Sequence, residues 1–121
     1  TAAGDVMRPE EMPLITPEMH LGEAIILVSK GKLGLGIAQR NGEIAGLITD
    51  GDIRRAMEKW KAQFFDKTVA DIMTASPKTV TSDTKISEVQ GIMNRYKIHS
   101  VLVTDGHNHL LGVVDHYSCM I

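Results

Sequence analysis

The sequence predicts an α+β fold made of two tandem β-α-β-β-α repeats with pseudo-two-fold symmetry, in which small mixed sheets pack on helices. Three observations carry this prediction. The 121-residue chain matches itself at an offset of 65 to 66 residues. Each copy contains an apolar stripe at helical spacing. Each copy also contains two apolar runs joined by a short turn, as in a hairpin.

The two copies correspond at several short stretches of sequence. These are residues 5–7 with 71–73, 21–24 with 86–89, 33–38 with 98–103, and 46–48 with 112–114. Residues 1–65 therefore form the first predicted repeat and residues 66–121 the second. The last helix of the second repeat would start near Asp115, so we expect it to be incomplete.

The first helix of each repeat follows a Met-containing turn and a short extended segment, at 13–15 and at 78–80. Its apolar residues recur at steps of three and four. They are Leu21, Ala24, Ile25 and Val28 in the first copy, and Ile86, Val89, Met93 and Tyr96 in the second. Gly31 is expected to end the first of these helices. Thr84 is expected to cap the second, with Glu88 in its first turn.

A hairpin follows in each copy. In the first, strands at 35–39 and 43–48 flank Asn41-Gly42, the strongest short-range hairpin signal. In the second, strands at 101–104 and 110–114 flank a turn at 105–108. The second helix of the first repeat starts at the sequence DGD, residues 50–52, and its apolar residues are Ile53, Ala56, Met57 and Trp60.

The composition excludes several classes of function. A formal net charge of −2 leaves no excess of Lys and Arg to neutralise phosphates, which argues against a nucleic-acid partner. The single cysteine, Cys119, cannot form an internal disulfide. No run approaches the roughly 20 apolar residues that span a bilayer. With a single cysteine, no membrane span and no visible signal peptide, we expect a cytoplasmic protein without membrane association. Because the chain starts at Thr1 without an initiator methionine, we also expect it to be a piece of a longer protein.

The stretch GLITDGDIRR, residues 46–55, is the strongest candidate site. Asp50 and Asp52 fit the nucleophile and general acid of a haloacid-dehalogenase-type phosphatase, but Arg54 stands where a small polar residue is required. A calcium loop opening at Asp50 would need Gly and Glu where Arg55 and Lys61 stand. Both interpretations are rejected.

An anion site at this stretch has a physical basis. A strand that runs into a helix at residues 49–52 directs free backbone N–H groups and the positive end of the helix dipole outward. The Thr49 hydroxyl can donate to a phosphate oxygen, Asp52 can accept from a ribose diol, and Arg54 or Arg55 can bind phosphate bidentately. The alternative is that Asp50 or Asp52 only caps the helix and the arginines are solvated. We favour the ligand site, with Asp50 as the cap.

This order of elements, with Gly-apolar-apolar-Thr-x-x-Asp at residues 46–52, resembles the cystathionine-β-synthase (CBS) domain, and the tandem resembles a Bateman module. Four stretches resemble more narrowly the C-terminal CBS pair of arabinose-5-phosphate isomerases: DVMR at 5–8, KLGLG at 32–36, TDGDIRR at 49–55 and HLLGVV at 109–114. Those enzymes serve the Kdo (lipopolysaccharide) and capsule pathways. The resemblance implies an N-terminal catalytic sugar-isomerase (SIS) domain, which this chain lacks. In the CBS family the Thr and Asp of the motif commonly hold phosphate and ribose, and here they match Thr49 and Asp52.

The second copy departs from this pattern. Asp115 stands opposite Thr49, and Ser118 stands opposite Asp52. The ribose-binding carboxylate is therefore missing, and Asp115 would repel a phosphate, although Ser118 can form a weak hydrogen bond with a ligand. We expect two sites of unequal quality, the first being the better nucleotide site.

The resemblance also implies residues that line the cleft between the repeats. They lie at the first strand of each repeat and just before the second strand: Ile15, Thr79, Thr81, His99 and Ser100. The alternative is that the polar ones satisfy backbone groups at strand ends. His107 and His109 at the hairpin tip lack a third metal ligand, so a solvated turn is expected there.

The resemblance thus implies a non-catalytic regulatory module of a sugar-phosphate isomerase. It requires no cofactor and binds a nucleotide or nucleotide-sugar, either AMP/ATP or CMP-Kdo, in the cleft between repeats. Its expected partners are a second copy, through CBS pairs, and its own SIS domain. Two alternatives are a purely structural dimerisation module and the CBS pair of another nucleotide-regulated enzyme or transporter.

Overall fold

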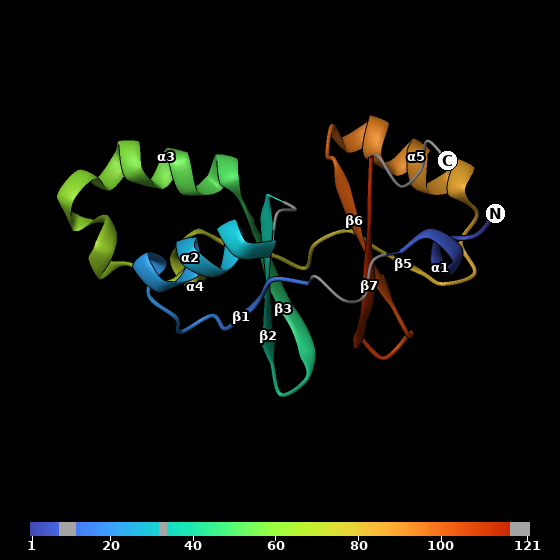
Figure 1. Cartoon of the computed structure of the whole chain (residues 1–121), viewed down its shortest axis with the longest axis horizontal. Coiled ribbons are helices and arrows are strands. Elements are labelled where there is room, and N and C mark those ends of the chain that lie inside the picture. The colour runs from blue at the N-terminus through green and yellow to red at the C-terminus, as the bar shows by residue number, and fades with distance from the viewer. Residues whose placement is uncertain (8–11, 32–33, 117–121) are drawn as a thin grey trace. The chain divides into compact units, whose positions relative to one another are not determined.

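The computed structural model describes residues 1–7, 12–31 and 34–116 (Figure 1). The chain forms two compact units. The first-repeat unit is Glu11–Pro77, and the second-repeat unit combines Thr1–Glu10 with Lys78–Ile121. Each unit contains a small mixed sheet with helices packed on it, so the predicted α+β fold is confirmed.

The first-repeat unit contains a four-stranded sheet in the order β1-β2-β3-β4. The strands are β1 (Leu14–Ile15), β2 (Leu35–Arg40), β3 (Glu43–Thr49) and β4 (Thr74–Ala75). β1 runs parallel to β2, and the other neighbours are antiparallel. Asn41 and Gly42 both adopt positive φ, 55° and 79°, as the predicted tight hairpin turn requires.

The helices of this unit are α2 (Leu21–Gly31), α3 (Asp50–Trp60), the 3-10 helix η1 (Lys61–Asp66) and α4 (Val69–Ile72) (Figure 1). The predicted stripes of α2 and α3 bury Leu21, Ala24, Val28, Ile53 and Ala56 against the sheet. Gly36 allows α2 to approach, because a Cβ there would lie 2.9 Å from both Ile15 Cδ1 and Val28 Cγ2. Neither η1 nor α4 was expected from the sequence.

The second-repeat unit contains a three-stranded sheet in the order β5-β6-β7. Its strands are β5 (Thr79–Thr81), β6 (Ser100–Thr104) and β7 (Leu110–Asp115), and its helices are α1 (Ala3–Val6) and α5 (Ile86–Tyr96). β5 is parallel to β6, which is antiparallel to β7. The core combines Val89 and Met93 of α5 with Ala3 of α1 and the buried valines of the sheet.

Two methionines show how the repeats exchange their first segments. Met73, at the start of the second sequence repeat, lies against Gly46 of β3, where a Cβ would come within 2.6 Å of its Sδ. Met7, at the start of the first repeat, lies in the same way against Gly112 of β7. The sequence repeat was predicted to divide at 65/66, whereas the compact units divide after residues 10 and 77 because of this exchange.

The predicted cap of α5 is wrong. Lys85 occupies the N-cap position and makes no side-chain hydrogen bond to the helix. The Thr84 hydroxyl instead accepts from Thr81 N at 3.2 Å, so it closes the turn after β5. Glu88 does lie in the first turn, as expected. The helix expected from Asp115 onward falls mostly on residues 117–121, outside the described part of the chain, and Asp115 itself ends β7.

Candidate functional site

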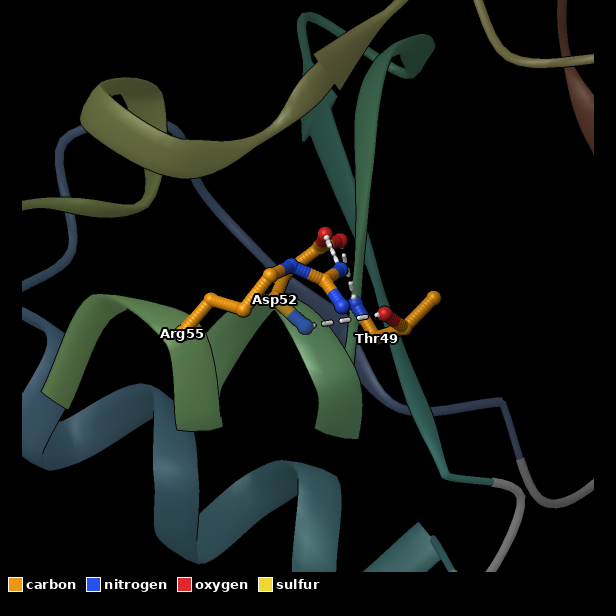
Figure 2. Close-up of polar contacts among 3 residues, drawn as sticks. All are labelled: Thr49, Asp52 and Arg55. Carbon is orange, nitrogen blue, oxygen red and sulfur yellow. Dashed lines mark hydrogen bonds and ion pairs between the residues drawn. The ribbon is translucent and has the colours of Figure 1, made fainter. Parts of the chain in front are cut away.

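The site centres on the junction of β3 and α3, where Thr49 ends the strand and caps the helix. Asp52 N donates to Thr49 Oγ1 at 3.1 Å, and Thr49 N donates to Asp52 Oδ2 at 2.9 Å (Figure 2). This reciprocal pair is a capping box with aspartate at its third helical position. The prediction that Asp50 caps the helix is wrong, because Asp50 is the first helical residue and Thr49 supplies the cap.

Arg55 folds back over the start of the same helix (Figure 2). Its Nη2 donates to Asp52 Oδ1 at 2.7 Å, and its side chain stays 64% exposed whereas that of Asp52 is 21% exposed. A Cβ on Gly51 would lie 3.1 Å from Arg55 Nη1, so the guanidinium reaches the first turn. Each Asp52 oxygen thus has one protein donor, and a carboxylate oxygen has lone pairs for a second.

The first backbone N–H groups of α3 have no carbonyl acceptor within the helix. Asp50 N donates to Gly34 O at 3.0 Å, and Asp52 N uses the Thr49 hydroxyl oxygen. Gly51 N–H is at a position where no carbonyl of the helix is available. Gly34 makes this approach possible with φ of 70°, in a place where a Cβ would lie 3.1 Å from Asp50 Oδ2.

These groups can act together on an anionic ligand that carries hydroxyls. Gly51 N–H, the Thr49 O–H proton and the Arg55 guanidinium are donors suited to phosphate oxygens. The Asp52 carboxylate is an acceptor suited to sugar hydroxyls. The junction therefore carries both the donors and the acceptor that a nucleotide requires, within one turn of α3.

Two further predicted residues lie in the same unit. Arg54 is exposed on α3 beside Arg55. Ile15 is only 2% exposed and packs in the core between β2 and α2, so its side chain faces the interior. The contacts thus bring together Thr49, Asp52 and Arg55 among the predicted site residues of this unit.

The remaining predicted residues belong to the second-repeat unit. Thr79 and Thr81 are exposed on β5. His99 is exposed just before β6, where its carbonyl accepts from His116 N at 2.8 Å and its ring lies 6.4 Å from that of His116. Ser100 pairs across the hairpin with Asp115, which is 9% exposed. Ser118 lies outside the described residues.

The pairing register confirms which residues of the two repeats correspond. Leu35 pairs with Thr49 between β2 and β3, and Ser100 pairs with Asp115 between β6 and β7. Asp115 thus occupies the structural place of Thr49. A carboxylate there has no hydroxyl to donate, so the two junctions differ in chemistry.

The tip of the second hairpin is organised by Asp105. Its Oδ1 accepts from His107 N at 2.8 Å and from His109 N at 3.1 Å, and its Oδ2 lies 3.0 Å from His109 Nδ1. Within the described ranges, no three His, Cys, Asp or Glu side chains gather in a way that would hold a metal ion. The two histidines therefore belong to a hydrogen-bonded turn.

This turn gives a pH prediction. The hydrogen bond from His107 N, with those from the ring and backbone of His109, lowers the pKa of Asp105 from its ordinary 3.8 to about 2. A depressed pKa in the folded state means that the ionised carboxylate stabilises the turn above pH 4, and that this contribution disappears as the pH falls toward 2. An NMR titration of the Asp105 carboxyl carbon should show a midpoint well below 3.8, and a midpoint at or above 3.8 would contradict it.

Gly34 and Gly51 were missed as site residues. The sequence signal for Gly51 was present, because Thr49-x-x-Asp52 is the spacing of a capping box and Gly51 lies within it. The same spacing recurs at Thr68 and Asp71, where Thr68 N donates to Asp71 Oδ2 at 2.9 Å at the start of α4. The role of Gly34 depends on the fold, because its contact is with a residue on another element.

Among the described helices, none combines the length and apolar character needed to cross a membrane.

Comparison with known proteins agrees with this architecture. The profile of the CBS domain matches residues 3–59 and 69–120. The chain is 36% identical over 104 residues to a probable arabinose 5-phosphate isomerase of Haemophilus influenzae, and 33% identical over 115 residues to arabinose 5-phosphate isomerase KpsF of Escherichia coli. These matches cover 86% and 94% of the chain but only 31% and 35% of the relatives, so the chain spans about a third of their length.

Two solved structures show the same fold. The CBS domain pair of protein MJ0100, in complex with 5'-methylthioadenosine and S-adenosyl-L-methionine, superposes with a TM-score of 0.88 at 24% identity, covering 99% of this chain and 93% of that one. The CBS domain protein PAE2072 from Pyrobaculum aerophilum, complexed with AMP, gives 0.86 at 19% identity, with 98% and 89% covered. With both repeats matched in sequence and in fold, the chain belongs to the CBS domain family, as a tandem pair of these domains.

Proposed function

We propose that this CBS pair is the non-catalytic regulatory module of an isomerase that interconverts arabinose 5-phosphate and ribulose 5-phosphate, and that it binds a nucleotide or nucleotide-sugar. The β3–α3 junction is the observation that carries the ligand part. It presents phosphate donors on Thr49, Gly51 and Arg55 beside a carboxylate, Asp52, that can accept from a ribose. The named relatives support the isomerase part.

Two ligand classes fit this chemistry. Adenine nucleotides are supported by the AMP bound to PAE2072 and by the adenosine compounds bound to MJ0100. CMP-Kdo carries a phosphate and a ribose as well, and it is an end product of the pathway that the resemblance implies. Both would place a phosphate against the Thr49 hydroxyl and a ribose against Asp52. Asp115 would make the second site weaker for either.

The proposed regulation acts through packing. A bound ligand would shift the packing of the module against the catalytic SIS domain of the parent enzyme. The coupling free energy would be reciprocal, so that the state of the catalytic domain also changes the affinity for the ligand.

A melting experiment tests the ligand part directly. AMP, ATP, CMP and CMP-Kdo at millimolar concentration are compared by thermal shift, because a ligand of the folded state raises its melting temperature. A ligand present at 100 times its dissociation constant contributes about 2.7 kcal/mol, which shifts the transition by several degrees. If none of the four ligands raises the melting temperature, the ligand proposal is wrong.

Two matched variants separate ligand binding from helix capping. Asp52→Ala and Asp71→Ala each remove the acceptor of one capping box, at a cost of about 1 kcal/mol. Both should melt earlier than the wild type by a similar amount. Only Asp52→Ala should lose the rise in melting temperature caused by the ligand. Equal ligand shifts in the two variants would show that Asp52 does not contact the ligand.

A purely structural dimerisation module remains the second candidate, because one surface observation favours it. Ile26, Met57 and Phe65 of the first-repeat unit are 56%, 42% and 61% exposed. Leu14 of the same unit is 45% exposed as well, and such side chains would mark an interface if they form one contiguous patch. Sedimentation analysis distinguishes the candidates: a dimer that no nucleotide stabilises would support this second function.

A further inference from the structure

The first seven residues act as a strap on the second-repeat unit. Three backbone hydrogen bonds join this N-terminal strap, residues 1–7, to the turn and helix start that follow β5. They run from Ala3 N to Thr84 O (2.7 Å), from Gly4 N to Ser82 O (2.9 Å) and from Ile86 N to Thr1 O (3.0 Å). The strap is therefore bonded to alternate residues, 82, 84 and 86, of the segment that directly follows β5.

The strap also contributes to the core. Ala3 is fully buried among Val80, Val89 and their neighbours. Met7 lies against Gly112, where a Cβ would come within 2.9 Å of its Sδ. Releasing the strap would expose this apolar surface, so its docked position is stabilised by packing as well as by hydrogen bonds.

Thr84 links the strap to β5. Its carbonyl accepts from the strap, while its hydroxyl accepts from Thr81 N at 3.2 Å and lies 3.3 Å from the Thr81 hydroxyl. Thr81 and Thr79 are exposed, and the residue between them, Val80, is buried, so the two threonines share the outer face of β5. Those threonines are the predicted ligand residues of this strand.

The first-repeat unit contains the same segment without this link. Its three equivalent backbone bonds run from Val69 N to Met19 O, from Ala70 N to Pro17 O and from Leu21 N to Lys67 O. Met19 stands in the place of Thr84, and its thioether cannot replace the hydroxyl that holds the strand. Both units keep the backbone bond of this turn, from Thr84 N to Thr81 O and from Met19 N to Thr16 O, so only the hydroxyl link is particular to the second-repeat unit.

We propose that docking of the N-terminal strap and ordering of the Thr81 end of β5 are coupled. A nucleotide that binds the second-repeat unit at Thr79 and Thr81, as distinct from the Thr49–Asp52 junction, would then tighten the strap, and release of the strap would weaken its binding. The ligand half of this statement rests on the proposed function. The two states are strap docked and strap released, and the coupling is reciprocal. In the proposed parent enzyme the catalytic domain precedes the strap, so the strap transmits occupancy of β5 toward it.

The coupling is tested first without ligand. Gly4→Leu should release the strap, because a Cβ there would lie 2.9 Å from Ser82 Cβ and 3.1 Å from Ser82 O. Amide hydrogen exchange of Thr81, followed by NMR, should then accelerate about fivefold to tenfold, the factor that corresponds to loss of about one hydrogen bond. Gly91→Leu on α5 is the control, because among the described residues nothing lies within 4 Å of a Cβ there. The proposal is overturned if, in Gly4→Leu, the amides of residues 3 and 4 exchange freely while the Thr81 amide still exchanges at its wild-type rate.

A second variant, Thr84→Val, tests the coupling if Gly4→Leu does not fold. This variant retains the backbone bond from the strap and removes only the hydroxyl that holds Thr81. Exchange at Thr81 should accelerate, and exchange at Ala3 should accelerate as well, because the coupling is reciprocal. Exchange at Ala3 that keeps its wild-type rate beside a faster Thr81 amide would overturn the proposal.

The ligand half is tested with AMP as the probe. AMP should slow amide exchange at Ala3 and Gly4 of the wild type several-fold, and Thr84→Val should lose this effect. If AMP raises the melting temperature but leaves the strap amides unchanged, the coupling is wrong and the proposed function stands. If none of the four nucleotides raises the melting temperature, the proposed function fails, and Gly4→Leu still decides the coupling.

Discussion

Replacing Phe64 by alanine is expected to lower the free energy of unfolding by about 3–5 kcal/mol, the range for an aromatic side chain lost from a packed core. Phe64 lies in η1, is 1% exposed and belongs to the core of the first-repeat unit. Its removal leaves a cavity that the surrounding helices can fill only in part. Urea denaturation followed by Trp60 fluorescence measures the loss, because the only tryptophan of the chain packs against this core.

The next residue is a matched control. Phe65 is 61% exposed, and its ring meets that of Phe64 edge-on, with centroids 5.3 Å apart. Phe65→Ala therefore loses that ring contact and little buried area, which corresponds to about 0.5–1.5 kcal/mol. Similar losses for the two variants would show that η1 does not bury Phe64 as described.

Replacing Gly46 by valine is expected to destabilise the same unit by about 1–3 kcal/mol through overpacking. A Cβ at this buried strand position would lie 2.6 Å from Met73 Sδ and 3.0 Å from Thr74 O, and the second contact is with backbone that cannot rotate away. The loss occurs although valine favours strands intrinsically. Urea denaturation of the variant gives its magnitude.

A double-mutant cycle assigns this cost to Met73. Met73→Ala removes the side chain that a larger residue at 46 would strike, so it should recover part of the loss when combined with Gly46→Val. Gly112→Val, opposite Met7, should destabilise the second-repeat unit for the same reason. Strictly additive effects of Gly46→Val and Met73→Ala would contradict this contact.

At the candidate site, the local sequence predicted part of the structure. The run of apolar residues into Thr49-x-x-Asp52 indicated a strand that becomes a helix at that point, and the structure has this junction. The assignment of the cap to Asp50 was wrong, because capping depends on which side chain reaches the third helical N–H. The return of Arg55 to Asp52 follows from i,i+3 spacing on one helix face, which the sequence contained.

Periodicity by itself determined most of the fold. The stripes of α2, α3 and α5 and the Asn41-Gly42 turn are local patterns, because helix and hairpin geometry repeat over a few residues. The internal match likewise determined that there are two similar repeats. Thr84 was assigned incorrectly because its hydroxyl has two local uses, a helix cap and a turn closure, and only the surrounding backbone selects one.

Only the tertiary structure decided which segments pack together. The Asp-x-Met stretches at 5–7 and 71–73 were visible as a repeat, yet nothing local indicates that Met7 packs on Gly112 and Met73 on Gly46. Burial of an apolar side chain is favourable in any close-packed environment. The sequence pattern therefore predicts that such a residue is buried, but it does not indicate which residues it packs against. The sequence thus determined the long helices, the two hairpins, the repeat and the Thr49–Asp52 motif. The path of the chain decided the short helices η1 and α4, the exchanged segments and the link from the strap through Thr84 to β5.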